Sequence, residues 1–116
     1  MTGGALEGLR VLDISTLFAA PQIAAALGDL GADVVKVEPP QGDPLRAMGA
    51  QRDGRSLMWA LVARNKRAIT LDLDTKVGLD LLQRLVEQAD VLVENCSRST
   101  LERWRCTYDE LAVRNS

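Results

Sequence analysis

The sequence predicts an α/β protein in which helices flank a Rossmann-like parallel sheet. Short segments rich in valine, isoleucine and leucine alternate along the chain with segments that have the period of an amphipathic helix. Two of the predicted strands, at residues 10–14 and 34–37, are joined by a single helical segment. A strand, a crossover helix and a second strand so close together form a parallel βαβ unit. We therefore assign residues 1–116 to one α/β domain, and we expect it to be part of a larger one.

This first unit runs from Leu9 to Glu38. Arg10–Ile14 has the composition of a strand that is buried on both faces. Pro21 suits the first position of a helix, which has a spare N–H, and Gly31 is a natural left-handed stop. The apolar stripe predicted for this helix consists of Ile23, Leu27 and Leu30.

Less regular sequence surrounds the first unit. Met1–Glu7 is predicted to be a loose leader, and Pro39–Ser56 is a long loop, of a kind that is more often functional than idle. Leu57–Ala63 is apolar, but its periodicity does not choose between helix and strand. Arg64–Arg67 is predicted to form a solvated basic turn, and the alternation in Ala68–Leu73 predicts a third strand.

The remaining residues continue the alternation of helix and strand. Asp74 or Thr75 can cap a helix that ends near Ala89, and 91–94 is a fourth strand. Two capping-box patterns, at residues 99–102 and 107–110, predict short helices. This order is that of a doubly wound sheet, in which another parallel strand would follow, so we expect the chain to be a fragment or a truncated product.

Composition excludes several classes of function. A net charge of −2 and an aromatic content of 3% provide neither a basic footprint nor a stacking platform for nucleic acid. There is no histidine, and the two cysteines are Cys96 and Cys106, so no metal site is expected. Free, reduced thiols favour a cytoplasmic protein. The longest apolar run, Leu57–Ala63, is too short to span a bilayer, and the N-terminus does not resemble a signal peptide.

Two common functions of parallel α/β proteins fit poorly. A dinucleotide-binding fold needs a glycine-rich turn after the first strand, and Ser15–Pro21 contains no glycine. Glu38 is therefore interpreted as a polar residue that ends a buried strand. A response-regulator receiver needs an acidic pair after the first strand, where Asp13 is single. Simple structural roles are also predicted for other residues: Asp13, Asp72 and Asp90 at strand ends and turns, Trp59 and Trp104 in packing, and Cys96 as a small buried residue.

Four sequence blocks, in this order and spacing, resemble the class III coenzyme A transferases, the family that includes formyl-CoA transferase and carnitine CoA-transferase. They are Gly8–Ser15 with Ala20 and Pro21; Leu30–Pro39 with Gly42, Asp43 and Arg46; Arg64–Arg67 with Leu71–Leu73; and Ala89–Asn95 with Arg103, Tyr108, Leu111 and Asn115. The resemblance extends from Leu6 to Asn115.

The resemblance implies an enzyme that moves CoA from an acyl-CoA to a carboxylic acid acceptor. Members of the family are several times longer than this chain and form interlocked homodimers. An aspartate carboxylate attacks the acyl-CoA thioester, gives a mixed anhydride and is converted to an aspartyl-CoA thioester. No aspartate of this chain matches that motif, so no catalytic residue is assigned here.

The resemblance does assign residues to the CoA site. They are Phe18, Ala19, Leu71, Asp72, Leu73, Asp74, Asn95, Cys96, Ser97 and Arg103. All of them lie at or after the carboxyl ends of predicted strands, where parallel sheets bind ligands. Arg103 is suited to bidentate binding of a phosphate. Asp74 stands where the family often has a lysine, and its charge would repel phosphate.

Two alternatives remain open from the sequence. The closer is an acyl-CoA racemase of the same superfamily, which moves an α-proton with an acid/base pair; the basic turn at Arg64–Arg67 weakly favours the transferase. The other is a non-catalytic module, either a truncated product or an assembly subunit that binds CoA without turnover.

Overall fold

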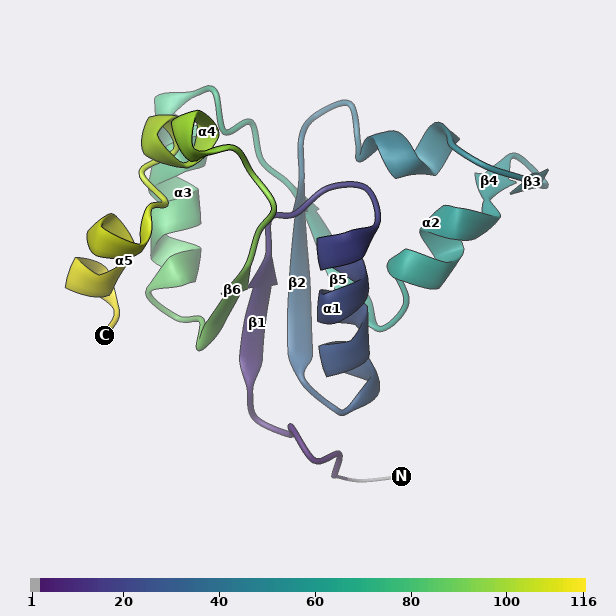
Figure 1. Cartoon of the computed structure of the whole chain (residues 1–116), viewed down its shortest axis with the longest axis horizontal. Coiled ribbons are helices and arrows are strands. Elements are labelled where there is room, and N and C mark those ends of the chain that lie inside the picture. The colour runs from purple at the N-terminus through teal and green to yellow at the C-terminus, as the bar shows by residue number, and fades with distance from the viewer. Residues whose placement is uncertain (1–2) are drawn as a thin grey trace.

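The computed structural model describes residues 3–116, which form a four-stranded parallel sheet with helices on both faces (Figure 1). The sheet contains β1 (Arg10–Asp13), β2 (Asp33–Glu38), β5 (Lys66–Thr70) and β6 (Val91–Val93) in the order β5-β2-β1-β6. β1 lies at the centre, where it pairs in parallel with β2 on one side and β6 on the other. The predicted fold class, an α/β parallel sheet with flanking helices, is confirmed.

Helices cover the two faces of the sheet in two groups. α1 (Ala19–Asp29) packs on one face, and α2 (Leu57–Val62) lies beside it. α3 (Lys76–Val86), α4 (Arg98–Arg103) and α5 (Tyr108–Arg114) contribute side chains to the other face. The segment at residues 57–63, for which the sequence left helix and strand open, is therefore a helix. No helix within residues 3–116 is long and apolar enough to cross a membrane.

The long segment after β2 has more structure than the predicted loop. It forms the 3-10 helix η1 (Pro44–Ala47) and an antiparallel hairpin of β3 (Gln51–Arg52) and β4 (Arg55–Ser56), which lies away from the sheet (Figure 1). Asp53 and Gly54 form the turn with φ values of 50° and 73°. An Asp-Gly pair suits such a turn, because both central residues need positive φ.

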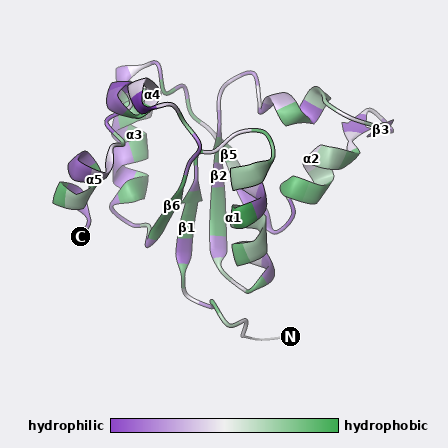
Figure 2. Ribbon diagram, in the orientation of Figure 1, coloured by the Kyte–Doolittle hydropathy of each residue, from purple (hydrophilic) through white to green (hydrophobic). Residues whose placement is uncertain are grey.

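Two apolar clusters, one on each face of the sheet, form the core. The first contains Val11, Ala20, Ala24, Ala32, Val34 and Val93; the second contains Leu12, Ile14, Val37, Leu82, Val86 and Cys106. Adjacent residues of β1 thus face opposite clusters, which confirms the prediction of a strand buried on both sides. Figure 2 shows hydrophobic residues along the strands and hydrophilic ones on α4.

The predicted apolar stripe of α1 is correct only at Leu27, which packs on the first cluster. Ile23 and Leu30 are 59% and 51% exposed, whereas Ala24 and Ala25 are fully buried. The helix approaches the sheet through small side chains, whereas the prediction relied on the spacing of large apolar residues. Pro21 is the third helical residue instead of the first, a position it tolerates because N–H groups of the first turn have no partner inside the helix.

Several predicted boundaries also shift. β5 begins at Lys66, so the basic turn is partly strand, and it ends at Thr70, short of the predicted Leu73. The N–H of Leu71 still donates to the carbonyl of Glu38, and its side chain packs on the second cluster. α4 is capped by Ser97, not by the predicted Ser99. Thr75 caps α3 and Thr107 forms a capping box with Glu110, as predicted.

The predicted loose leader is wrong over its described part. The N–H of Leu6 donates to the carbonyl of Leu30, and the Leu6 side chain packs on the first cluster. Met1 and Thr2 lie outside the described residues. The segment before β1 therefore covers the end of α1.

Candidate functional site

The site predicted from the sequence lies where the four parallel strands end. β1 ends at Asp13, β2 at Glu38, β5 at Thr70 and β6 at Val93, and the following loops leave the sheet at the same edge. This is the edge at which open α/β sheets bind ligands.

Asn95 joins the loop after β6 to the loop after β1. Its Oδ1 accepts a hydrogen bond of 3.0 Å from the N–H of Thr16, and its Nδ2 donates one of 2.8 Å to the Thr16 carbonyl. The amide is therefore engaged with backbone, and its main effect is to hold one loop against the other. Sequence reasoning placed Asn95 at this edge without predicting that partner.

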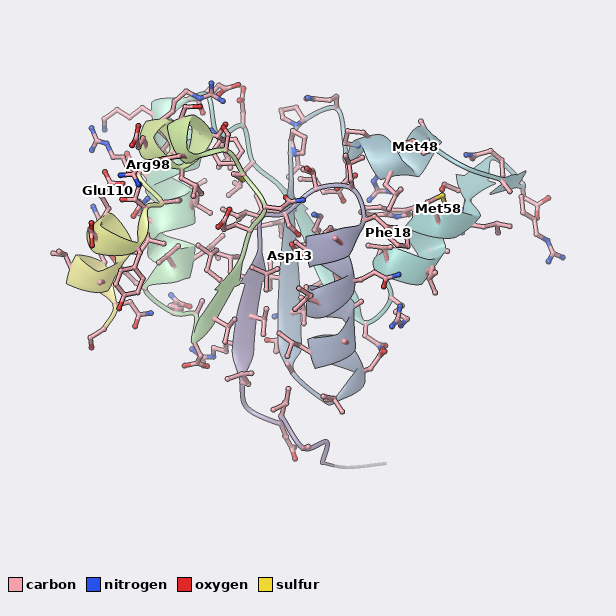
Figure 3. The ribbon with its side chains drawn as sticks, viewed as in Figure 1. Asp13, Phe18, Met48, Met58, Arg98 and Glu110 are labelled. Atoms are coloured by element: carbon pink, nitrogen blue, oxygen red, sulfur yellow. The ribbon has the colours of Figure 1, made fainter. Side chains whose placement is uncertain are left out.

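The loop between β1 and α1 presents apolar side chains to solvent. Leu17 has a φ of 67°, and the Leu17 and Phe18 side chains are 43% and 42% exposed. Ala19, the first residue of α1, is also exposed. Figure 3 shows Phe18 at the start of α1, on the side of the molecule where Met58 of α2 lies. Phe18 is thus available for contact with a ligand and does not plug the core.

Arg103, at the end of α4, meets Asp74, in the loop after β5. The guanidinium Nε lies 3.6 Å from the carboxylate Oδ1, and both side chains are mostly exposed. The Arg103 guanidinium also lies 5.9 Å from the centroid of the Trp104 ring, which itself packs on the second cluster. The structure therefore places Arg103, which is predicted to bind a phosphate, beside Asp74, whose negative charge would repel that phosphate.

The other predicted site residues have local structural partners. Asp72 accepts a 3.1 Å hydrogen bond from the N–H of Asp74, as a turn residue does. Leu71 and Leu73 are partly buried against the second cluster. Ser97 caps α4, with its Oγ 3.2 Å from the N–H of Thr100.

Cys96 is half-buried, so its predicted role as a buried filler holds only in part. Burial raises the pKa of its thiol, and the nearby charge of Glu94 adds to that effect. The thiol is therefore a poor nucleophile, because the thiolate is the reactive form.

A buried network of four charged side chains lies beneath this edge. Lys66 Nζ is 2.8 Å from Asp13 Oδ2, and Lys36 Nζ is 3.8 Å from Asp13 Oδ1 and 3.4 Å from Asp43 Oδ2. The side chains of all four residues are at most 2% exposed. Two lysines and two aspartates balance in charge, as buried ions must.

The network is also bonded to the backbone of the β1–α1 loop and of the first turn of α1. Lys36 donates to the carbonyl of Ser15, and Lys66 donates to the carbonyl of Pro21 at 2.7 Å. Asp13 accepts from both the N–H and the hydroxyl of Ser15. Burial lowers the pKa of Lys66, and the hydrogen bond to Asp13 opposes that shift.

Sequence reasoning missed this network. The sequence predicts only a strand-end role for Asp13; for Lys66 it predicts a place in a solvated turn, which the family resemblance raises to a possible wall of the site. The signal was present in β2, where Lys36 interrupts a run of buried valines and so requires a counter-charge.

Glu38 extends the polar region toward the hairpin. Its carboxylate accepts hydrogen bonds of 2.7 Å and 2.6 Å from Nε and a terminal nitrogen of Arg46, and a third from the N–H of Asp43. The Arg46 guanidinium stacks 4.0 Å from the centroid of the Trp59 ring. Glu38 is thus the polar end of a buried strand, as predicted, and it fixes the following loop.

The fold and this edge define a class of proteins, the parallel α/β domains that present a ligand site at the carboxyl ends of their strands. Comparison with known families narrows the class. The sequence pattern of CoA-transferase family III matches residues 6–116, and the chain belongs to this family.

Individual relatives agree with this assignment. The chain is 45% identical to succinyl-CoA–D-citramalate CoA-transferase of Chloroflexus aurantiacus, over 95% of this chain and 28% of that protein. It is 40% identical to succinyl-CoA:mesaconate CoA-transferase of Haloarcula hispanica, over 97% and 30%. The crystal structure of a CAIB/BAIF family protein from Brucella suis superposes with a TM-score of 0.91 at 36% identity, over 98% and 32%. The chain thus spans less than a third of the length of these relatives.

Proposed function

We propose that this chain is the N-terminal, CoA-binding portion of a class III CoA transferase, a cytoplasmic homodimer of interlocked subunits that moves CoA from an acyl-CoA to a carboxylic acid. The observation that supports it best is the family match over residues 6–116, because the matched residues include every side chain predicted to contact CoA. The fold brings the loops that follow β1, β5 and β6 to one edge of the sheet.

The residues divide into three roles in this proposal. Phe18 and Ala19 provide the surface that CoA contacts, and Arg103 supplies a fixed positive charge for a phosphate. Residues 71–74 and 95–97 form the walls on either side. The nucleophilic aspartate belongs to the longer protein, so the chain binds and orients CoA without transferring it.

Titration of the chain with CoA by calorimetry tests this proposal. We expect saturable binding of CoA and weaker binding of pantetheine, which offers no phosphate to Arg103. We also expect no CoA exchange when the chain alone is incubated with an acyl-CoA and a panel of carboxylic acids. A folded chain that does not bind CoA would refute the binding role. Turnover by the chain alone would refute the proposal that the catalytic residue lies outside this chain.

A further inference from the structure

We propose that Lys36, Lys66 and Asp13 are positioning residues, which hold the β1–α1 loop in the conformation that binds CoA. This inference rests on the proposed function, because that function assigns Phe18 and Ala19 of the loop to CoA. The three side chains are buried and so cannot touch a ligand themselves.

Three side chains from outside the loop anchor it and the helix that follows. Lys36 of β2 donates to the carbonyl of Ser15 at the start of the loop, and Asn95, which follows β6, binds both backbone groups of Thr16. Lys66 of β5 donates to the carbonyl of Pro21 in the first turn of α1. The start of the loop and the helix turn that follows it are therefore both tied to the sheet.

The conformation of the loop requires such anchors. Leu17 has a φ of 67°, which is costly for a residue with a branched side chain and no hydrogen-bonding group. Leu17 and Phe18 both point enough into solvent to be more than 40% exposed, although collapse onto the protein would bury apolar surface. Phe18 makes no side-chain hydrogen bond as the N-cap of α1. The local sequence does not favour this arrangement, so contacts from outside the loop, those of Lys36, Lys66 and Asn95, must hold it.

Charge balance decides how the network can be tested. Removing Lys66 alone leaves Asp13 with one counter-ion, Lys36, at 3.8 Å, and an uncompensated buried charge destabilises the whole fold. The double variant Asp13→Asn with Lys66→Met removes one charge of each sign and leaves the pair of Lys36 and Asp43 intact. It cuts the tie to Pro21 without creating a net buried charge.

A matched control lies one residue along the same strand. Arg67 pairs with Asp33 at 2.7 Å, also between β5 and β2, but both side chains are more than half exposed. The variant Asp33→Asn with Arg67→Met removes the same charges, with the same residue-type change at the acid, from the amino-terminal end of β2, opposite to the candidate site. It reports the effect of losing a β5–β2 ion pair that is not bonded to the loop.

The experiment compares the chain and the two double variants by thermal unfolding, amide hydrogen exchange and calorimetry with CoA. The informative amides are those of Ser15, Thr16 and Gln22, which are hydrogen-bonded and bracket the loop. In the network variant we expect their exchange to rise at least about tenfold relative to β1 and β6, and CoA affinity to fall about tenfold, which is the effect of about 1.4 kcal/mol. In the control variant, the exchange rates of these amides and the CoA affinity should both equal those of the unvaried chain.

The outcomes separate this inference from the proposed function. Unchanged loop exchange in the folded network variant would overturn the positioning role, and so would faster exchange with unchanged CoA affinity. If the unvaried chain does not bind CoA while loop exchange responds as expected, the proposed function fails and the anchoring stands. If the network variant does not fold, exchange in the unvaried chain decides: Ser15 and Thr16 must be as protected as β1, and rapid exchange there contradicts the anchors.

Discussion

The guanidinium of Arg103 lies 3.6 Å from the carboxylate of Asp74, so the arginine proposed to bind a phosphate already faces a negative charge. The contact joins the loop after β5 to the end of α4. Because both side chains are mostly exposed, the pair itself contributes little to stability. Its consequence is for ligands, since any phosphate that binds Arg103 must share it with Asp74.

Replacement of Arg103 by alanine should weaken CoA binding by about 1.5 kcal/mol, the contribution of a hydrogen bond to a charged group. Calorimetry measures the change. Arg52→Ala on the hairpin is the control, because Arg52 is exposed and lies far along the chain from the predicted site. Equal affinity of the Arg103 variant and the unvaried chain would remove this residue from the CoA site.

Replacement of Asp74 by asparagine should strengthen CoA binding by about 0.5–1 kcal/mol, because it removes a repulsive charge at the surface. The gain should shrink in the Arg103→Ala background if Asp74 competes with the phosphate for Arg103, which a double-mutant cycle detects. Pantetheine, without phosphate, should bind the unvaried chain and the Asp74 variant equally. A gain of full size without Arg103 would show that Asp74 does not act through Arg103, and an equal gain with pantetheine would show that it does not act on a phosphate.

The sequence predicted the sheet well because its signals there are local. Buried strands on both faces, glycine stops and the cap at Thr75 each depend on a few neighbouring residues. The buried alanine face of α1 was not predicted, because close helix–sheet packing depends on small side chains, which do not stand out as an apolar period. Features set by neighbouring residues in one segment were thus predictable, and features set by packing between segments were not.

The candidate site shows the same division. The carboxyl edge follows from the order of strands and helices, so the place of the candidate residues in the fold was predictable. The partners of Asn95 and Asp13 were not, because they lie 79 and 53 residues away in the sequence. Lys66 in particular lies in a stretch that resembles a solvated turn in the sequence. Its partner Asp13 is on β1, which β2 separates from β5 in the sheet.

Glu38 should make the stability of the chain depend on pH in the acid range. The hydrogen bond from Arg46, helped by the N–H of Asp43, holds the pKa of Glu38 below its ordinary value of 4.5. A carboxyl with a lowered pKa stabilises the fold fully above its unfolded pKa, and the effect is lost as pH falls through the folded pKa.

Urea unfolding of the chain and of Glu38→Gln checks this effect. Near neutral pH the variant should be less stable by about 1–2 kcal/mol, because Arg46 loses a charged acceptor. Below pH 4.5 the difference should shrink as Glu38 of the unvaried chain takes up a proton. A difference that stays constant across this range would contradict the role of the carboxylate charge.

Glycine at position 78 of α3 should give a more stable chain than alanine, even though alanine forms helices better. A Cβ built on Gly78 would lie 1.8 Å from the carbonyl oxygen of Asp72, which the turn before the helix holds in place. The preference for alanine is worth about 1 kcal/mol, and displacement of packed backbone costs about 1–3 kcal/mol, so Gly78→Ala should destabilise the chain. Val77→Ala, at a site that is 70% exposed in the same turn, should change stability by less than about 0.5 kcal/mol. Thermal unfolding measures the stability of both variants. A Gly78→Ala variant that is more stable than the unvaried chain would show that the turn at Asp72 moves aside at little cost.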